Sequence, residues 1–105
     1  MPIWATAPVG EAPSIVLITW RILQTDTDER HFVGYNLVDR EGRVSTPIDQ
    51  FDLATLTGRT CSGRIYQLQG RPGVDADAMY VWNAWCRANG VLRWENVTSK
   101  ALAGQ

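Results

Sequence analysis

Residues 60–90 read TCSGRIYQLQGRPGVDADAMYVWNAWCRANG and contain the clearest structural signals of the sequence. A short run of β-branched and aromatic residues is followed by a glycine- and proline-rich turn, and then by apolar residues at helical spacing. Asp75 is suited to cap a helix N-terminus, and Asn89-Gly90 supplies a left-handed stop. The pattern predicts an α-helix over about residues 75–89. The residues expected on its apolar stripe are Trp82, Trp85 and Cys86.

Upstream of this stretch, apolar and polar residues alternate as they do in strands. Residues 14–24, SIVLITWRILQ, predict a long strand, which is apolar on both faces in its first half and therefore central in a sheet. Strict alternation would turn Val16, Ile18, Trp20 and Ile22 to one face of that sheet. Further strands are predicted over 31–39, 43–51, 57–61, 64–69 and 91–97, with Pro47 favouring a sheet edge or a bulge in the third strand.

The connections between these strands are short and rich in turn residues, which favours antiparallel pairing of neighbours. The sequence therefore predicts an α+β fold, an antiparallel β-meander of five to six strands with one α-helix packed on one face. The length of 105 residues indicates a single domain over residues 1–105. Residues 1–13, with three prolines, are expected to form an irregular arm, and residues 98–105 a frayed tail.

Composition limits the possible partners. The net charge of −1 gives no general attraction to nucleic acid or to an anionic membrane. We therefore expect neither of them as a partner. Two cysteines are too few for a disulfide scaffold or an unaided zinc site. The first residues lack the pattern of a signal peptide, and no apolar run approaches the ~20 residues of a membrane-spanning helix. We expect a cytoplasmic protein.

The residues that could support catalysis are few. His31 is the only histidine, and it falls within strand alternation, where it is more often a structural residue than a catalyst. Cys61 has Arg59 and Arg64 near it in sequence and is the better nucleophile candidate, whereas Cys86 lies near the helix C-terminus. No hydrolase, nucleotide-binding or dinucleotide-binding motif occurs. These observations argue against an enzyme and predict no catalytic residue, metal ion or cofactor.

One candidate function is the binding of an anion such as phosphate or a nucleotide. The segment between Asp52 and Asp75 contains no acidic residue but does contain Arg59, Arg64 and Arg71. Gly73 leads into the predicted helix N-terminus, where free backbone N–H groups favour negative charge. Asp75 and the glycine requirement of a strand-to-helix turn offer a structural explanation for the same pattern. Small-ligand or anion binding is therefore kept as an alternative.

Aromatic residues support the leading hypothesis. Five tryptophans in 105 residues are many for one small core, since each ring buries roughly 150–250 Å². Aromatic side chains left at the margin of a core commonly anchor interfaces. We expect a non-enzymatic binding or assembly module that forms a homo-oligomer, most simply a dimer, or binds a protein partner through aromatic surface and a strand edge. The interface candidates are Trp4, Tyr80, Trp82, Trp85 and Trp94.

Four segments together carry a resemblance. They are RHFVGY, VSTPIDQFD, TCSGRIYQLQGRPG and DADAMYVWNAWCRANG, which cover roughly residues 30–90. They resemble a family of small bacterial proteins of unknown function, in which an S-G-R-[VI]-Y-x-L-x-G-x-P-G segment precedes a tryptophan-containing helix. The resemblance implies a bacterial accessory protein of the kind found on mobile genetic elements. It implies no activity and no site residue.

Overall fold

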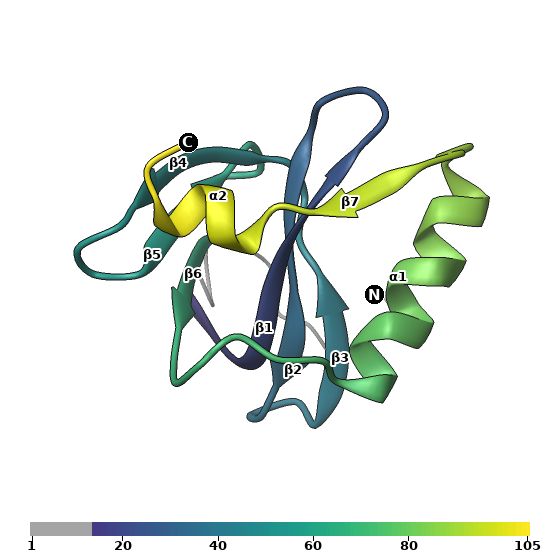
Figure 1. Cartoon of the computed structure of the whole chain (residues 1–105). Coiled ribbons are helices and arrows are strands. Elements are labelled where there is room, and N and C mark those ends of the chain that lie inside the picture. The colour runs from purple at the N-terminus through teal and green to yellow at the C-terminus, as the bar shows by residue number, and fades with distance from the viewer. Residues whose placement is uncertain (1–13) are drawn as a thin grey trace.

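The computed structural model describes residues 14–105, shown in Figure 1. The predicted N-terminal arm and its Trp4 lie outside the described residues. The strands are β1 (Ser14–Thr25), β2 (Arg30–Asn36), β3 (Glu41–Val44), β4 (Ile48–Asp52), β5 (Thr57–Thr60), β6 (Ile65–Leu68) and β7 (Trp94–Asn96), and the helices are α1 (Ala76–Ala88) and α2 (Thr98–Leu102).

The sheet is mixed, so the prediction of a purely antiparallel meander is wrong. The strand order is β3-β2-β1-β6-β5-β4, and β7 also pairs with β1. One pair is parallel, β1 with β6, from Ser14↔Ile65 to Leu17↔Leu68. The two halves of the sheet are antiparallel hairpins, as predicted, but the crossing from β3 to β4 lets the second half wind back beside the first. At 12 residues, β1 is long enough to hold β6 and β7 on one edge and β2 on the other.

A bulge in β1 changes which of its side chains share a face. Thr19 has a φ of 47°, and the register with β2 shifts between Ile18 and Arg21. A bulge interrupts the alternation of period two, so the faces exchange at this point. The expected grouping of Val16, Ile18, Trp20 and Ile22 is therefore wrong. The core residues that β1 contributes to one face are Ile15, Leu17, Trp20 and Ile22.

Gly34 of β2 lies opposite this bulge and permits the close approach of the two strands. A Cβ at Gly34 would lie 3.0 Å from both Cα and Cβ of Trp20. A glycine inside a strand commonly marks a bulge or a close neighbour, and here the neighbour is Trp20.

Helix α1 confirms the predicted helix and covers β2 and β3, as Figure 1 shows. The Asp75 carboxylate accepts a hydrogen bond from the Ala78 backbone N–H at 2.9 Å, and the helix ends at Asn89 before Gly90. The core beneath it consists of Leu23, Val33, Ala78, Trp82 and Cys86.

The opposite face of the sheet carries the second helix, which replaces the predicted frayed tail. Val97 and Ala101 are buried in the core of that face, and the Ile22 backbone N–H donates to Thr98 Oγ1 at 3.0 Å. These contacts hold α2 against β1, as Figure 1 shows in yellow. Between residues 14 and 105, neither helix is long and apolar enough to cross a membrane.

Candidate binding site

The candidate site lies where the curved sheet fails to close on itself. Ser45 carries the chain out of β3 while its backbone N–H donates to the Phe32 carbonyl oxygen at 2.9 Å. Strand β4 then starts beside β2 without pairing to it, and pairs with β5 instead. Within residues 14–105, no strand pairs with the other edge of β4. A hollow beside β4 is lined by residues of β1, of the β1–β2 turn and of α2, as well as by residues of β4 itself.

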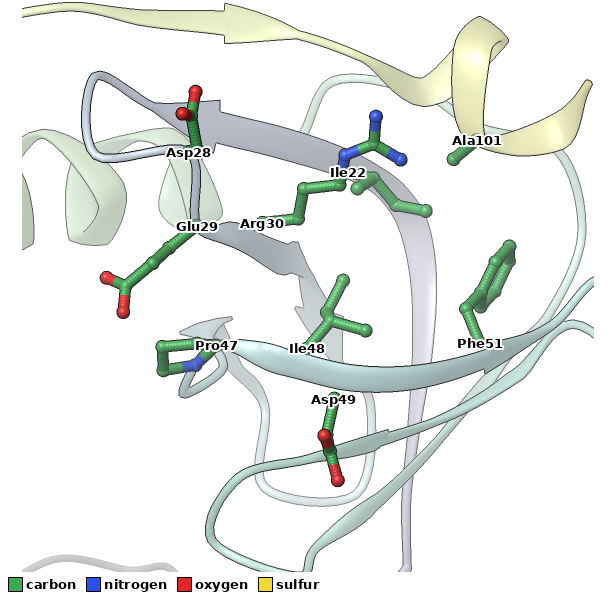
Figure 2. A pocket seen from close by; sticks show the side chains of 9 residues that line it. All are labelled: Ile22, Asp28, Glu29, Arg30, Pro47, Ile48, Asp49, Phe51 and Ala101. Carbon is green, nitrogen blue, oxygen red and sulfur yellow. The ribbon is translucent and has the colours of Figure 1, made fainter. Parts of the chain in front are cut away.

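A bulge in β4 turns two large apolar side chains toward that hollow. Ile48 pairs with Thr60 and Gln50 pairs with Arg59, so β4 has one extra residue at this point. Side chains three positions apart then lie on one face, although strict alternation would separate them. Figure 2 shows Ile48 and Phe51 both pointing into the space above β4, whereas Asp49 points to the opposite side.

The space is a cavity of about 440 Å³. This volume lies in the range of roughly 300–1,000 Å³ that is typical of ligand pockets. Ile22 and Ala101 complete its apolar part from β1 and α2, and Figure 2 shows them across from β4. The remaining lining residues are Asp28, Glu29, Arg30, Pro47 and Asp49.

Arg30 is the one cationic residue of the lining, and it is held in place by its neighbours. Its Nε donates to Gln24 Oε1 at 2.9 Å, while the Gln24 amide nitrogen donates to Asp28 Oδ1 at 3.3 Å. This chain of two hydrogen bonds orients the guanidinium group, which Figure 2 shows beside Ile22. Arg30 forms no ion pair with any carboxylate of residues 14–105.

The three acidic residues lie around the mouth of the cavity and turn away from its centre. The Asp28 and Glu29 side chains are exposed and point outward, as Figure 2 shows. Asp49 forms an ion pair with Arg59 at 3.0 Å on the β5 side of β4. The centre of the cavity therefore combines apolar surface with one guanidinium group.

A second hollow of about 210 Å³ continues the first. The two share Arg30, Phe51 and Ala101, which places the arginine where they meet. The second hollow extends along the end of β4 to Leu53, and Gly104 and Gln105, which follow α2, also line it. Together they form a groove that follows the unpaired edge of β4, and we call it the β4 groove.

The structure separates the predicted interface residues. Trp82 is 0% exposed and stacks on Trp85 with ring centroids 5.3 Å apart. Trp94 meets the edge of Trp82 at 5.9 Å and is 38% exposed, whereas Tyr80 points away from the core and is 74% exposed. Trp82 is therefore a core residue, and among the members of the set within residues 14–105, Tyr80 and Trp94 reach solvent most.

The predicted anion-binding residues lie in different surroundings. Arg59 is paired with Asp49, and Arg64 is buried. Arg71 is exposed in the loop before α1, and the Gly73 N–H donates to the Trp20 carbonyl oxygen at 3.0 Å. Asp49 and the Trp20 carbonyl therefore already engage Arg59 and the Gly73 N–H, two of the groups that an anion would need.

His31 and the cysteines have surroundings that suit structural residues. His31 is buried against Trp85 at 4.6 Å between ring centroids, and its Nδ1 donates to the Ser45 carbonyl oxygen at 2.8 Å. Burial lowers the pKa of His31, and the Ser45 carbonyl and the nearby Glu29 oppose that shift. Burial also raises the pKa of the Cys86 thiol, with Asp26 contributing, whereas Cys61 is exposed. No group of three or more metal-ligating side chains gathers among residues 14–105.

Sequence reasoning did not single out the groove residues. Pro47 was correctly linked to a sheet edge or a bulge, since it separates β3 from the bulged edge strand β4. The sequence assigns no binding role to Asp28, Glu29 or Arg30. Ala101 belonged to the expected frayed tail. No single-residue signal links these three regions, because only the curvature of the sheet brings them together.

Comparison with models of known families, with curated proteins and with solved structures finds no match to this chain. The resemblance of residues 30–90 to small bacterial proteins therefore stays a prediction.

Proposed function

We propose that the chain is a non-enzymatic binding module that receives an extended segment of a partner protein along the unpaired edge of β4. The observation that carries this proposal is the β4 groove itself, where an edge that no other strand of residues 14–105 pairs with lies beside a cavity of about 440 Å³ lined by both apolar and charged residues. The proposal keeps the protein partner and the strand edge expected from the sequence, and moves the site away from the tryptophans.

Strand addition explains how such a groove would bind. An edge strand presents unpaired backbone N–H and C=O groups, which an incoming extended segment satisfies. Alternate side chains of the segment then point to the same side, and one of them fills the cavity between Ile48 and Phe51. Main-chain hydrogen bonds supply affinity, and the cavity supplies selectivity.

The charges on β4 favour a partner of different sequence over a second β4. Its sequence is IDQFD, and both Asp49 and Asp52 are exposed. Antiparallel pairing of two copies would bring four carboxylates together, and charged residues on edge strands oppose such pairing. Arg59 neutralises Asp49 only. A partner segment with basic residues meets no such repulsion.

A second candidate, the homo-oligomer expected from the aromatic content, would use a different surface. Leu92 is 85% exposed and Trp94 is 38% exposed, on either side of Arg93. Exposed apolar side chains of this size are common in interfaces. A mass measured by light scattering at high micromolar concentration tests this candidate, which is rejected if the chain is a monomer.

An array of hexapeptides tethered by their N-termini tests the proposed function. Each hexapeptide spans about 20 Å when extended, enough to follow β4. Every peptide is made both with a free carboxyl end and with an amide end. We expect a subset to bind the chain and to lose binding when Ile48→Trp fills the cavity. Val74→Trp, at an exposed position outside the groove lining, is the control and keeps binding. Equal binding to both variants, or no binding to any peptide, would overturn the proposal.

A further inference from the structure

The geometry points to the chemical class of the bound segment: we infer that the β4 groove takes the free C-terminal end of a partner chain, with the terminal carboxylate on Arg30 and an apolar last side chain in the cavity. This inference rests on the proposed function and specifies which part of a partner the groove receives.

The guanidinium group of Arg30 has the surroundings of a site for a carboxylate. It is half-buried beside an apolar cavity, and a guanidinium group in such a place normally has a carboxylate partner. Its Nε is held by Gln24, and none of the carboxylates of residues 14–105 pairs with it. Two terminal nitrogens in a planar fork match the two oxygens of one carboxylate. The ligand is therefore expected to supply the missing anionic group.

The neighbours of Arg30 decide between the two sources of a peptide carboxylate. Figure 2 shows the guanidinium extending toward Ile22 and Ala101, above the apolar side chains of β4. An internal Asp or Glu would bring its carboxylate into the cavity as the side chain, and would leave the apolar surface of Ile48 and Phe51 uncovered. A C-terminal residue carries a carboxylate and an apolar side chain on the same Cα, so it satisfies both.

The acidic rim is compatible with this arrangement. The Asp28 and Glu29 carboxylates point outward, and Asp49 is engaged with Arg59. They lie at the mouth of the larger hollow, whereas Arg30 lies where the two hollows meet. A basic residue upstream of the C-terminus would therefore meet the rim while the terminal carboxylate meets Arg30.

The paired peptide array supplies the test. Peptides that end in Leu, Phe or Val with a free carboxylate are expected to bind, and their amidated copies to bind at least tenfold more weakly. A third set, amidated and carrying an internal Glu, distinguishes a side-chain carboxylate from the terminal one. If the amidated copies bind equally well, or if the internal Glu restores binding, the inference is wrong.

Variants of Arg30 complete the test. Arg30→Gln removes the charge and is expected to weaken binding of the free-carboxylate peptides by about tenfold to a hundredfold, the value of a lost charge-assisted hydrogen bond. The same variant should bind amidated peptides as the natural chain does, a result that a merely structural role would not give. Arg87→Gln, at an exposed position on α1, is the control.

The outcomes separate the two proposals. If peptides bind in the groove but Arg30→Gln binds free and amidated forms as the natural chain does, the carboxylate inference is overturned and strand addition stands. If Ile48→Trp has no effect on any peptide, the proposed function itself is overturned.

Discussion

Replacing Ala101 with leucine should stabilise the chain and abolish binding at the same time. Ala101 is 6% exposed, lines both hollows of the β4 groove, and turns its methyl group toward the cavity in Figure 2. If the cavity is a packing defect, filling it would have no functional effect. If it is the place where a partner side chain docks, the same substitution removes that place.

The magnitude follows from the added surface. Leucine adds three carbon atoms, and each buried CH₂ is worth about 0.8 kcal/mol, which gives an upper value of about 2.4 kcal/mol. Fixing the side chain costs about 0.5–1 kcal/mol, so the free energy of unfolding should rise by about 1.5 kcal/mol. For a domain of this size, that corresponds to a rise in Tm of about 6–12 °C.

Urea unfolding and thermal melting measure the change in stability. The affinity for the best peptide of the array measures the loss of binding. Ala103→Leu, at an exposed position after the same helix, is the matched control and should change neither quantity. A lower Tm for Ala101→Leu would show that the cavity cannot accept a side chain. Unchanged peptide binding would show that it is not the docking site. Either result refutes the reasoning.

Three further predictions concern the fold. Burial lowers the pKa of His31 in the folded chain, so as the pH falls the unfolded chain takes up the proton first. The free energy of unfolding should therefore decrease as the pH falls below about 6.5. The urea midpoint should fall less from pH 7.5 to pH 5.5 in His31→Phe than in the natural chain, and equal slopes would contradict this. Gly34→Ala should lower the free energy of unfolding by about 1–3 kcal/mol, because the new Cβ lies 3.0 Å from Trp20. An unchanged urea midpoint would mean that β2 shifts to make room for the Cβ at no cost. Asp75→Ala should lower the free energy of unfolding by about 1 kcal/mol, because it removes the cap on the Ala78 N–H. A thermal midpoint, followed by circular dichroism, that equals that of the natural chain would contradict this role of Asp75.

The helix was predictable because its signals are local. Asp75, the spacing of Trp82 and Cys86, and the Asn89 stop all lie within one short stretch, and the observed helix has the predicted position. Most strands were predictable for the same reason, but the single strand predicted over residues 43–51 is wrong, because the chain divides it into β3 and β4 around Pro47. The faces of β1 were not, because the exchange at Thr19 depends on a single backbone conformation that its residue type does not favour.

The pairing of β1 with β6 and the site could not be predicted, for a related reason. The residue pattern of SIVLITWRILQ does not indicate that its first residues pair with β6 and its last residues with β7. The groove joins Ile22, Arg30, Phe51 and Ala101, which are separated by up to 79 positions in the sequence. Such a site appears only when the curvature of the sheet is known, and the aromatic count drew attention to α1 instead.

Hydrogen exchange along β4 measures whether a partner segment docks at this strand. With the best array peptide bound, amides in residues 48–52 should exchange more slowly than in the free chain, because the incoming segment satisfies the unpaired edge. The exposed loop at residues 37–40 should exchange unchanged and serves as an internal control. Slower exchange that appears elsewhere in the chain and spares residues 48–52 would contradict docking at the edge of β4.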